Sequence, residues 1–151
     1  MSDMARAASG RIVVGVDGSP ESKAALNWAL NEARHCHAAV EAVHAWQYPA
    51  VAFSHFGGEA LPLIAPGDVE TAAHGLLRKT VEEISGADCD VAVTPKLARG
   101  HPAEVLLALS EDADMLVVGS RGHGGFKGML LGSVSNHVIH HAHCPVVVVR
   151  T

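Results

Sequence analysis

The chain has 151 residues, of which 48% are hydrophobic, 18% charged and 4% aromatic, and its formal net charge is -5. We therefore expect one globular domain over residues 1–151 with an aliphatic core and a flexible tail over residues 1–10. The negative charge and the scarcity of aromatic residues argue against nucleic-acid binding. We also expect a cytoplasmic protein without a membrane partner, because no apolar stretch reaches about 18 residues and the three cysteines form no CxxC pair.

The first strand and helix follow each other closely. Residues Ile12–Val16 form a continuous apolar run, which is typical of a strand buried on both faces. Asp17 comes directly after this run, and Ser19 can cap a helix whose first position is Pro20. The helical spacing of apolar residues continues to about His37.

The middle of the chain contains a second strand, a long irregular segment and a second helix. Residues Ala38–Trp46 alternate as a strand does. The segment Gln47–Gly67 contains three prolines and three glycines and has no period, so we expect a loop. It could form a flap over a ligand, contact a partner chain or pack on the nearest helix. Asp68 is expected to cap a second helix that ends at Gly86.

The second half of the chain continues the alternation of strands and helices. A third strand is expected around Val91–Leu97, at or near a sheet edge because Pro95 interrupts its hydrogen bonding. The elements that follow are a helix, a strand, a helix and a strand, at Pro102–Asp112, Met115–Val118, Ser133–His143 and Pro145–Val149.

This order of elements predicts a doubly wound α/β fold. The expected sheet has five strands, is mainly parallel and has helices on both faces. Ligands of such sheets bind beyond the carboxyl ends of the strands, where the strand order reverses. If the first and fourth strands are neighbours there, Asp17 lies beside Gly119.

The segment Val117–Val134 contains six glycines between a predicted strand and a predicted helix. Backbone N–H groups and the helix N-terminus can therefore converge on one anion, as in phosphate sites. Three familiar glycine motifs do not fit. Lys127 lacks the neighbours of a Walker loop, the first strand–helix turn lacks the further glycines of a dinucleotide fingerprint, and Ser120 lacks a glycine two residues before it.

What does fit is a glycine spacing that resembles another family. Gly119, two residues, Gly122, nine residues and then Gly132 with Ser133 closely resemble the signature of the ATP-binding branch of the universal stress protein family. The blocks VVGVDGSPESKAALNWAL, VHAW, GHPAEVLL and HCPVVVVR agree with this family in the same order. The resemblance implies a Rossmann-like fold related to adenine-nucleotide alpha-hydrolases, with strand order 3-2-1-4-5.

The resemblance also implies a ligand and its site, namely ATP, with magnesium, in the crevice at the switch point. Asp17 would lie near the ribose and phosphates, although it could instead cap or brace the adjacent turn. The backbone of Ala45 would contact adenine. The complete set of implied nucleotide-binding residues is Asp17, Ala45, Val118, Gly119, Arg121, Gly122, Gly132, Ser133 and Val134.

We expect an ATP-binding regulator of a stress response with little or no rapid turnover, because no positioned base is evident near the loop. The alternatives are an ATP hydrolase, in which His123 or Asp17 assists water, and a sensor of AMP or cyclic AMP. The resemblance further implies a homodimer through Val146, Val147, Val148 and Val149. We expect no metal site, since His137 and His141, one helical turn apart, also fit a solvated helix face together with His140.

Overall fold

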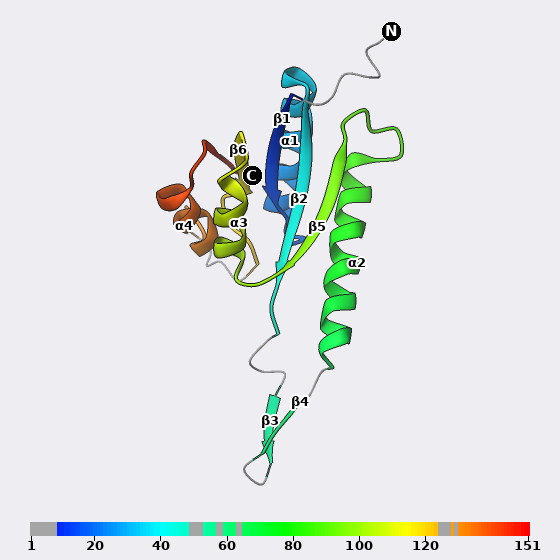
Figure 1. The fold of residues 1–151 in the computed structure, drawn as a ribbon, viewed down its shortest axis with the longest axis vertical. Helices are drawn as coiled ribbons and strands as arrows, with labels where there is room; N and C mark the ends of the chain where they lie inside the picture. Colours follow the sequence, from blue (N-terminus) through cyan, green and yellow to red (C-terminus); the bar gives the residue numbers. More distant parts are fainter. Residues whose placement is uncertain (1–8, 49–52, 57–58, 63–64, 124–127, 129) are drawn as a thin grey trace.

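The computed structural model describes residues 9–48, 53–56, 59–62, 65–123, 128 and 130–151. Its main feature is a parallel sheet with the strand order β5-β2-β1-β6-β7, which confirms the predicted order (Figure 1). The strands of this sheet are β1 (Gly10–Gly15), β2 (Ala38–Trp46), β5 (Val93–Arg99), β6 (Met115–Gly119) and β7 (Val146–Val149).

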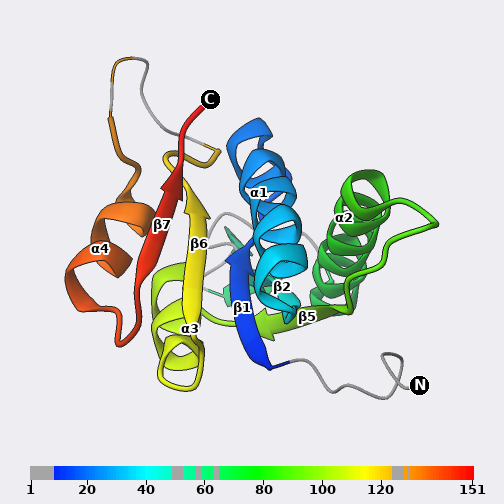
Figure 2. The same ribbon diagram turned by 90° about the horizontal axis from the view of Figure 1, so that it is seen from above.

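Helices cover both faces of the sheet, as the alternation of elements predicted. Helices α1 (Pro20–Cys36) and α2 (Pro66–Ser85) lie on one face, and α3 (Pro102–Ser110) and α4 (Ser133–His141) lie on the other (Figure 2). Neighbouring residues of β1 pack on opposite faces of the sheet. Val13 and Val14 are both fully buried but belong to different core clusters. This is why the strand reads as an unbroken apolar run rather than an alternating one.

The N-terminus of α1 is fixed by local hydrogen bonds. The Ser19 side chain accepts a hydrogen bond from the Ser22 N–H at 3.2 Å, and Pro20 occupies the first helical turn, as predicted. The helix ends when His37 adopts a left-handed conformation with φ of 56°. The short path from β1 to α1 therefore has one defined geometry, which matters because the candidate site lies beside it.

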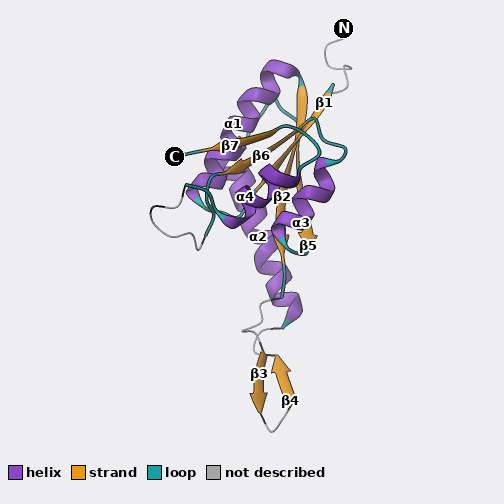
Figure 3. Ribbon diagram, turned by 90° about the vertical axis from the view of Figure 1, so that its left-hand side faces the viewer, coloured by secondary structure: helices purple, strands orange, loops and turns teal. Residues whose placement is uncertain are grey.

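The expectation of a loop over Gln47–Gly67 was wrong in part. Strands β3 (Phe53–Phe56) and β4 (Glu59–Pro62) pair there as an antiparallel hairpin, which extends away from the sheet and its helices (Figure 3). The pair Gly57-Gly58 between two short runs is a hairpin signal in the sequence. The lack of a regular apolar period in the rest of the segment conceals this signal.

The start of α2 also differs from the prediction. The helix begins at Pro66, and its N-cap is Ala65, which offers no side-chain hydrogen bond. Asp68 therefore lies within the first turn, where its charge favours the positive end of the helix dipole, and does not cap the helix.

Strands β5 and β7 form the two edges of the main sheet. The Val40 N–H donates to the Ala92 carbonyl and the Gly100 N–H donates to the Trp46 carbonyl, so even-numbered residues of β5 bond to β2. Pro95 consequently turns its nitrogen, which has no hydrogen, toward the open edge, and its prediction as an edge residue is confirmed. None of the described helices has both the length and the apolar character needed to cross a bilayer.

Candidate functional site

A cavity of about 420 Å³ lies beyond the carboxyl ends of β1, β2 and β6. The chain leaves β1 for α1 on one face and leaves β6 for α4 on the other, so the cavity lies at the switch point of the sheet. All nine residues predicted for the site line this cavity. Its further lining residues are Gly15, Val16, Ser22, Val43, His44, Pro102, Leu106, His123 and Ser135.

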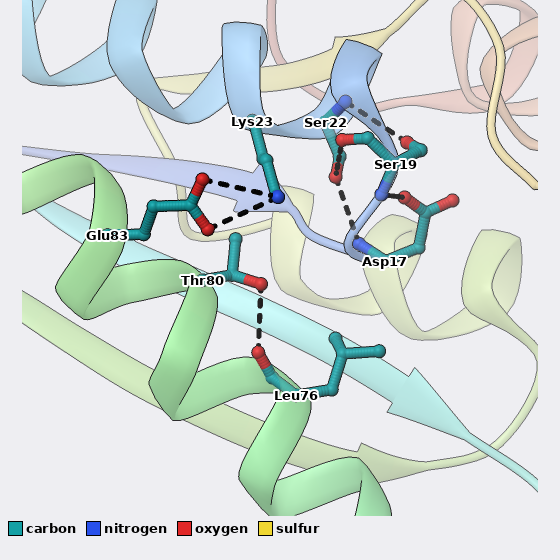
Figure 4. Close-up of polar contacts among 7 residues, drawn as sticks. All are labelled: Asp17, Ser19, Ser22, Lys23, Leu76, Thr80 and Glu83. Atoms are coloured by element: carbon teal, nitrogen blue, oxygen red, sulfur yellow. Dashed lines mark hydrogen bonds and ion pairs between the residues drawn. The ribbon is translucent and has the colours of Figure 1, made fainter.

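Asp17 joins two segments that are distant in sequence. One carboxylate oxygen accepts the N–H of Ser19 at 2.9 Å, and the other accepts the N–H of His123 at 3.3 Å. The Asp17 N–H itself donates to the Ser22 hydroxyl at 3.2 Å (Figure 4). Asp17 therefore braces its own turn, one of the two roles that its position suggested, and also ties the end of β1 to the loop after β6.

Two opposing effects act on the Asp17 carboxyl group. Burial raises its pKa, but the hydrogen bonds from Ser19, Ser22 and His123 favour the charged form and together outweigh burial. The pKa of Asp17 is therefore below its ordinary value of 3.8. The side chain is a carboxylate at neutral pH, and it places a fixed negative charge at the cavity wall.

The three signature glycines are needed for internal contacts as well as for ligand access. A Cβ atom on Gly119 would lie 2.8 Å from backbone carbon C of Glu21, so α1 could not pack as closely on β6. A Cβ atom on Gly122 would occupy the space of the Asp17 carboxylate, and one on Gly132 would lie 3.3 Å from the Cα atom of Arg121. The three glycines of the motif thus lie at three close contacts, of which the backbone contact at Gly119 leaves no room for a Cβ atom.

Arg121 lines the cavity but already has a charged partner. Its guanidinium lies 3.6 Å from the carboxylate of Glu21, and the two side chains are 32% and 15% exposed. Glu21 comes from the first turn of α1. Glu21 therefore forms an ion pair with Arg121, the one described arginine that lines this cavity.

The N-terminus of α4 opens into the cavity without a cap. The first bond within the helix runs from the Asn136 N–H to the Gly132 carbonyl at 3.0 Å. Within the described part of the chain, the N–H groups of Ser133, Val134 and Ser135 have no acceptor. Three backbone donors and the positive end of the helix dipole are therefore available to an anion in the cavity.

Hydrogen bonds to Ser120 fix the position of the residues at the start of this helix. The Gly132 N–H donates to the Ser120 carbonyl at 2.6 Å, and the Ser135 hydroxyl donates to the same carbonyl at 2.9 Å. Ser120 in turn donates its N–H to the Val149 carbonyl at 2.8 Å. These buried contacts set the direction of α4 relative to the end of β6.

Part of the cavity lining is apolar. Val43, Leu106 and Val118 are at most 4% exposed and belong to one core cluster. His44 lies at the edge of this part, with its Nδ1 atom 2.8 Å from the Val16 carbonyl. Sequence reasoning missed His44, because nothing in the spacing of β2 shows that its side chain reaches β1. The cavity therefore combines apolar lining residues with a row of polar donors.

The histidines of α4 lie outside this cavity. The rings of His137 and His141 have centroids 4.7 Å apart, as expected for residues one turn apart on a helix. Among the described residues, no three His, Cys, Asp or Glu side chains are grouped so that they could hold a metal ion.

A parallel sheet with helices on both faces and a glycine-lined cavity at its switch point defines a doubly wound α/β domain with a small-ligand site. The model of the Universal stress protein family matches residues 9–150, and the chain belongs to this family.

Known proteins agree with this assignment. The chain is 38% identical to the universal stress protein Rv2005c of Mycobacterium tuberculosis over 139 residues, which cover 92% of the chain and 45% of that protein. It thus spans about half the length of the curated relatives that it matches. Universal stress protein UspA from Lactobacillus plantarum superposes with a TM-score of 0.75 at 22% identity, covering 96% of this chain and 100% of the other.

A second similar solved structure contains a ligand. It is a universal stress protein in complex with cAMP, with a TM-score of 0.68 and 26% identity, and the match covers 95% of this chain and 98% of the other.

Proposed function

We propose that this chain binds an adenine nucleotide, ATP with magnesium, in the switch-point cavity and acts as a nucleotide-dependent regulator. The observation that carries the proposal is the N-terminus of α4, whose first three N–H groups have no acceptor among the described residues and border a cavity that also has apolar lining residues. A nucleotide has the matching halves, since its phosphates are anionic and its base is largely apolar on both faces.

The residues of the cavity fit the parts of this ligand. Ser133 and Val134 would receive the phosphates, with the exposed Ser133 hydroxyl as a further donor. The backbone of Ala45 and the side chains of Val43 and Leu106 would contact the base. Magnesium would supply positive charge at the phosphates. Asp17 is the one described carboxylate in the lining, and both of its oxygens already accept backbone N–H groups.

A second candidate keeps the site and changes the ligand to AMP or cyclic AMP. It is favoured by the complex with cAMP of a protein that is similar over nearly its whole length. Titration calorimetry with ATP, AMP, cyclic AMP and adenosine would rank the ligands. We expect affinity to rise with phosphate charge if the α4 N-terminus binds the phosphate tail. Equal affinity for adenosine and ATP would contradict the assignment of the phosphates.

The Gly122→Ala variant tests the location of the site. A methyl group there displaces the Asp17 carboxylate and the loop, so nucleotide affinity should fall at least tenfold, which corresponds to about 1.4 kcal/mol. Gly75→Ala is the matched control, since a Cβ atom at Gly75 on α2 would meet no atom within 4 Å. If both variants bind as the unchanged chain does, the cavity is not the nucleotide site.

The proposed regulator turns over its nucleotide slowly or not at all. The residue best placed to assist water is His123, which lines the cavity and is exposed. Steady hydrolysis of ATP at about 1 per second or faster, lost in the His123→Ala variant, would show instead that the protein is an ATP hydrolase.

We further propose that two copies of the chain pair through β7. This strand is a sheet edge, and all four of its valines are only half-buried, so it leaves apolar surface and backbone groups for a partner. Light scattering of the purified chain at micromolar concentration should give the mass of a dimer. The mass of a monomer under these conditions would contradict the proposal.

A further inference from the structure

A second cavity, of about 680 Å³, lies between α2 and the carboxyl-terminal parts of β2 and β5. It shares no lining residue with the switch-point cavity. Helix α2 contributes one stripe of residues, β5 contributes alternate residues and β2 contributes its last residue. These lining residues are Gly67, Glu70, His74, Leu77 and Arg78, then Pro95, Leu97 and Arg99, and finally Trp46.

Helix α2 borders the cavity with different kinds of residue along its length. Toward its C-terminal half, Leu77 is 1% exposed and packs into the main core. The positions that follow the same stripe toward the N-terminus are His74 and Glu70, which are exposed. Ala73, one turn before Leu77, is still buried at 7% exposure, so the polar side chains of His74 and Glu70 lie beside the apolar face of the helix. The floor of the cavity therefore stays apolar while its rim is charged.

The charges of the rim do not balance. Arg78 and Arg99 are permanent cations, His74 adds a titratable one, and Glu70 is the one carboxylate among the described lining residues. No carboxylate in the described part of the chain forms an ion pair with either arginine. Two guanidinium groups thus border one cavity with a single described carboxylate, Glu70, which forms an ion pair with neither of them.

One of these guanidinium groups is held in place by an aromatic ring. The Cζ atom of Arg99 lies 5.7 Å from the centroid of the Trp46 ring, and the two residues are register partners in β5 and β2. A guanidinium that rests on a ring loses little entropy when it binds, and its edge N–H groups remain available for a carboxylate or phosphate. The half-buried Trp46 also gives the cavity a flat apolar wall.

We propose that this cavity is a second ligand site, for a small organic anion. Its carboxylate or phosphate group pairs with Arg78 and Arg99, and its apolar body rests on Trp46, Leu77 and Leu97. The site is separate from the nucleotide site and does not depend on it. Because α2 and β5 both border the cavity, a bound ligand links the helix to the sheet edge.

Trp46 provides a direct readout. The chain has two tryptophans, so in a Trp28→Phe variant all tryptophan fluorescence comes from Trp46. The probe is phenyl phosphate, with inorganic phosphate as an anion without an aromatic ring and benzyl alcohol as an uncharged aromatic compound of similar size. We expect saturable quenching by phenyl phosphate, weaker binding of inorganic phosphate and no saturable effect of benzyl alcohol. If phenyl phosphate gives no saturable change, or if benzyl alcohol binds as tightly, the proposal is wrong.

Charge variants in the Trp28→Phe background identify the groups involved. Arg78→Gln and Arg99→Gln should each weaken phenyl phosphate about tenfold, the factor that a charge-assisted hydrogen bond contributes. Lys79→Gln is the matched control, because it removes one charge from the next position of α2 outside the cavity. Equal affinity of all three variants would overturn the proposal.

A competition experiment separates this site from the nucleotide site. Saturating ATP should leave the affinity for phenyl phosphate unchanged, since the two cavities share no residue. If ATP displaces phenyl phosphate, the probe occupies the switch-point cavity and the second site is refuted, whereas the nucleotide proposal stands. Circular dichroism of each variant would verify that α2 is intact.

Discussion

The carboxylate of Asp17 fills the space beside Gly122 where any other residue would carry its Cβ atom. This contact joins the end of β1 to the loop after β6, and the neighbouring N–H of His123 donates to the same carboxylate. A methyl group at Gly122 forces Asp17 to turn away and to lose these hydrogen bonds. We expect Gly122→Ala to lower the free energy of unfolding by about 1–3 kcal/mol, measured by urea denaturation. An unchanged midpoint would contradict this account of the glycine.

The lowered pKa of Asp17 predicts a pH-dependent contribution to stability. Its folded-state pKa lies below the ordinary value of 3.8, so the charged carboxylate stabilises the fold above that pH. The contribution disappears as the pH falls through the folded-state pKa. Asp17→Asn should therefore cost about 1 kcal/mol at pH 7, a modest value because solvent screens a half-buried group. Urea denaturation from pH 7 to pH 3 should show the two proteins converging at the acid end, and a constant difference would count against this role.

The ion pair between Glu21 and Arg121 should influence nucleotide affinity. Glu21 competes with ligand phosphates for the guanidinium, so Glu21→Gln should release Arg121 and strengthen ATP binding about threefold. Adenosine, which has no phosphate, should bind equally well to both forms. Glu82→Gln, at an exposed position near the end of α2, controls for the change in net charge. Calorimetry that gives weaker ATP binding for Glu21→Gln would show that Glu21 positions Arg121 for the ligand.

The cap of α1 should contribute measurably to stability. Ser19 is 1% exposed, and its hydroxyl accepts the N–H of Ser22, so Ser19→Ala should cost about 1–2 kcal/mol. Ser133→Ala at the start of α4 is the comparison, since that side chain is exposed and has no described hydrogen bond. It should change the free energy of unfolding by less than about 0.5 kcal/mol. Similar losses for both serines would mean that the capping bond contributes little.

The hydrogen-bond pattern of β7 allows a selective test of the dimer. The Leu116 N–H donates to the Pro145 carbonyl and the Ser120 N–H donates to the Val149 carbonyl, so odd-numbered residues bond to β6. The N–H of Val148 therefore faces the open edge, and Val148→Pro should produce a folded monomer. Val147→Pro removes a bond to β6 and should instead unfold the strand. A dimeric Val148→Pro variant, seen by light scattering, would exclude pairing through the backbone of this edge.

Local patterns predicted the main sheet well, because β1 and β6 are short apolar runs bounded by turn residues and β2 alternates as a strand does. Val13 and Val14 face opposite layers, which is the physical meaning of an unbroken run. The strand order came from family resemblance and not from any period. The hairpin β3–β4 was missed because its prolines and glycines dominate the composition of the segment. Helix α2 was placed three residues late because Asp68, rather than Ala65, was expected to be its N-cap.

The candidate site was predicted in its positions but not in its contacts. The nine predicted residues all line one cavity, and their positions came from the resemblance to the universal stress protein family. Whether each of them contacts a ligand stays a prediction. The pairing of Arg121 with Glu21 and the contact of His44 with Val16 join segments far apart in the chain. Spacing within one segment contains no information about such distances.

The hydrogen bond between His123 and Asp17 spans 106 positions of the sequence. The cavity is therefore assembled from both ends of the domain, with β1 and α1 from the first quarter and β6 and α4 from the last third. During synthesis, an emerging chain cannot complete this pocket until α4 has left the ribosome. Ligand capture would thus occur only after α4 has emerged, and a bound nucleotide would distinguish chains that contain α4 from shorter ones.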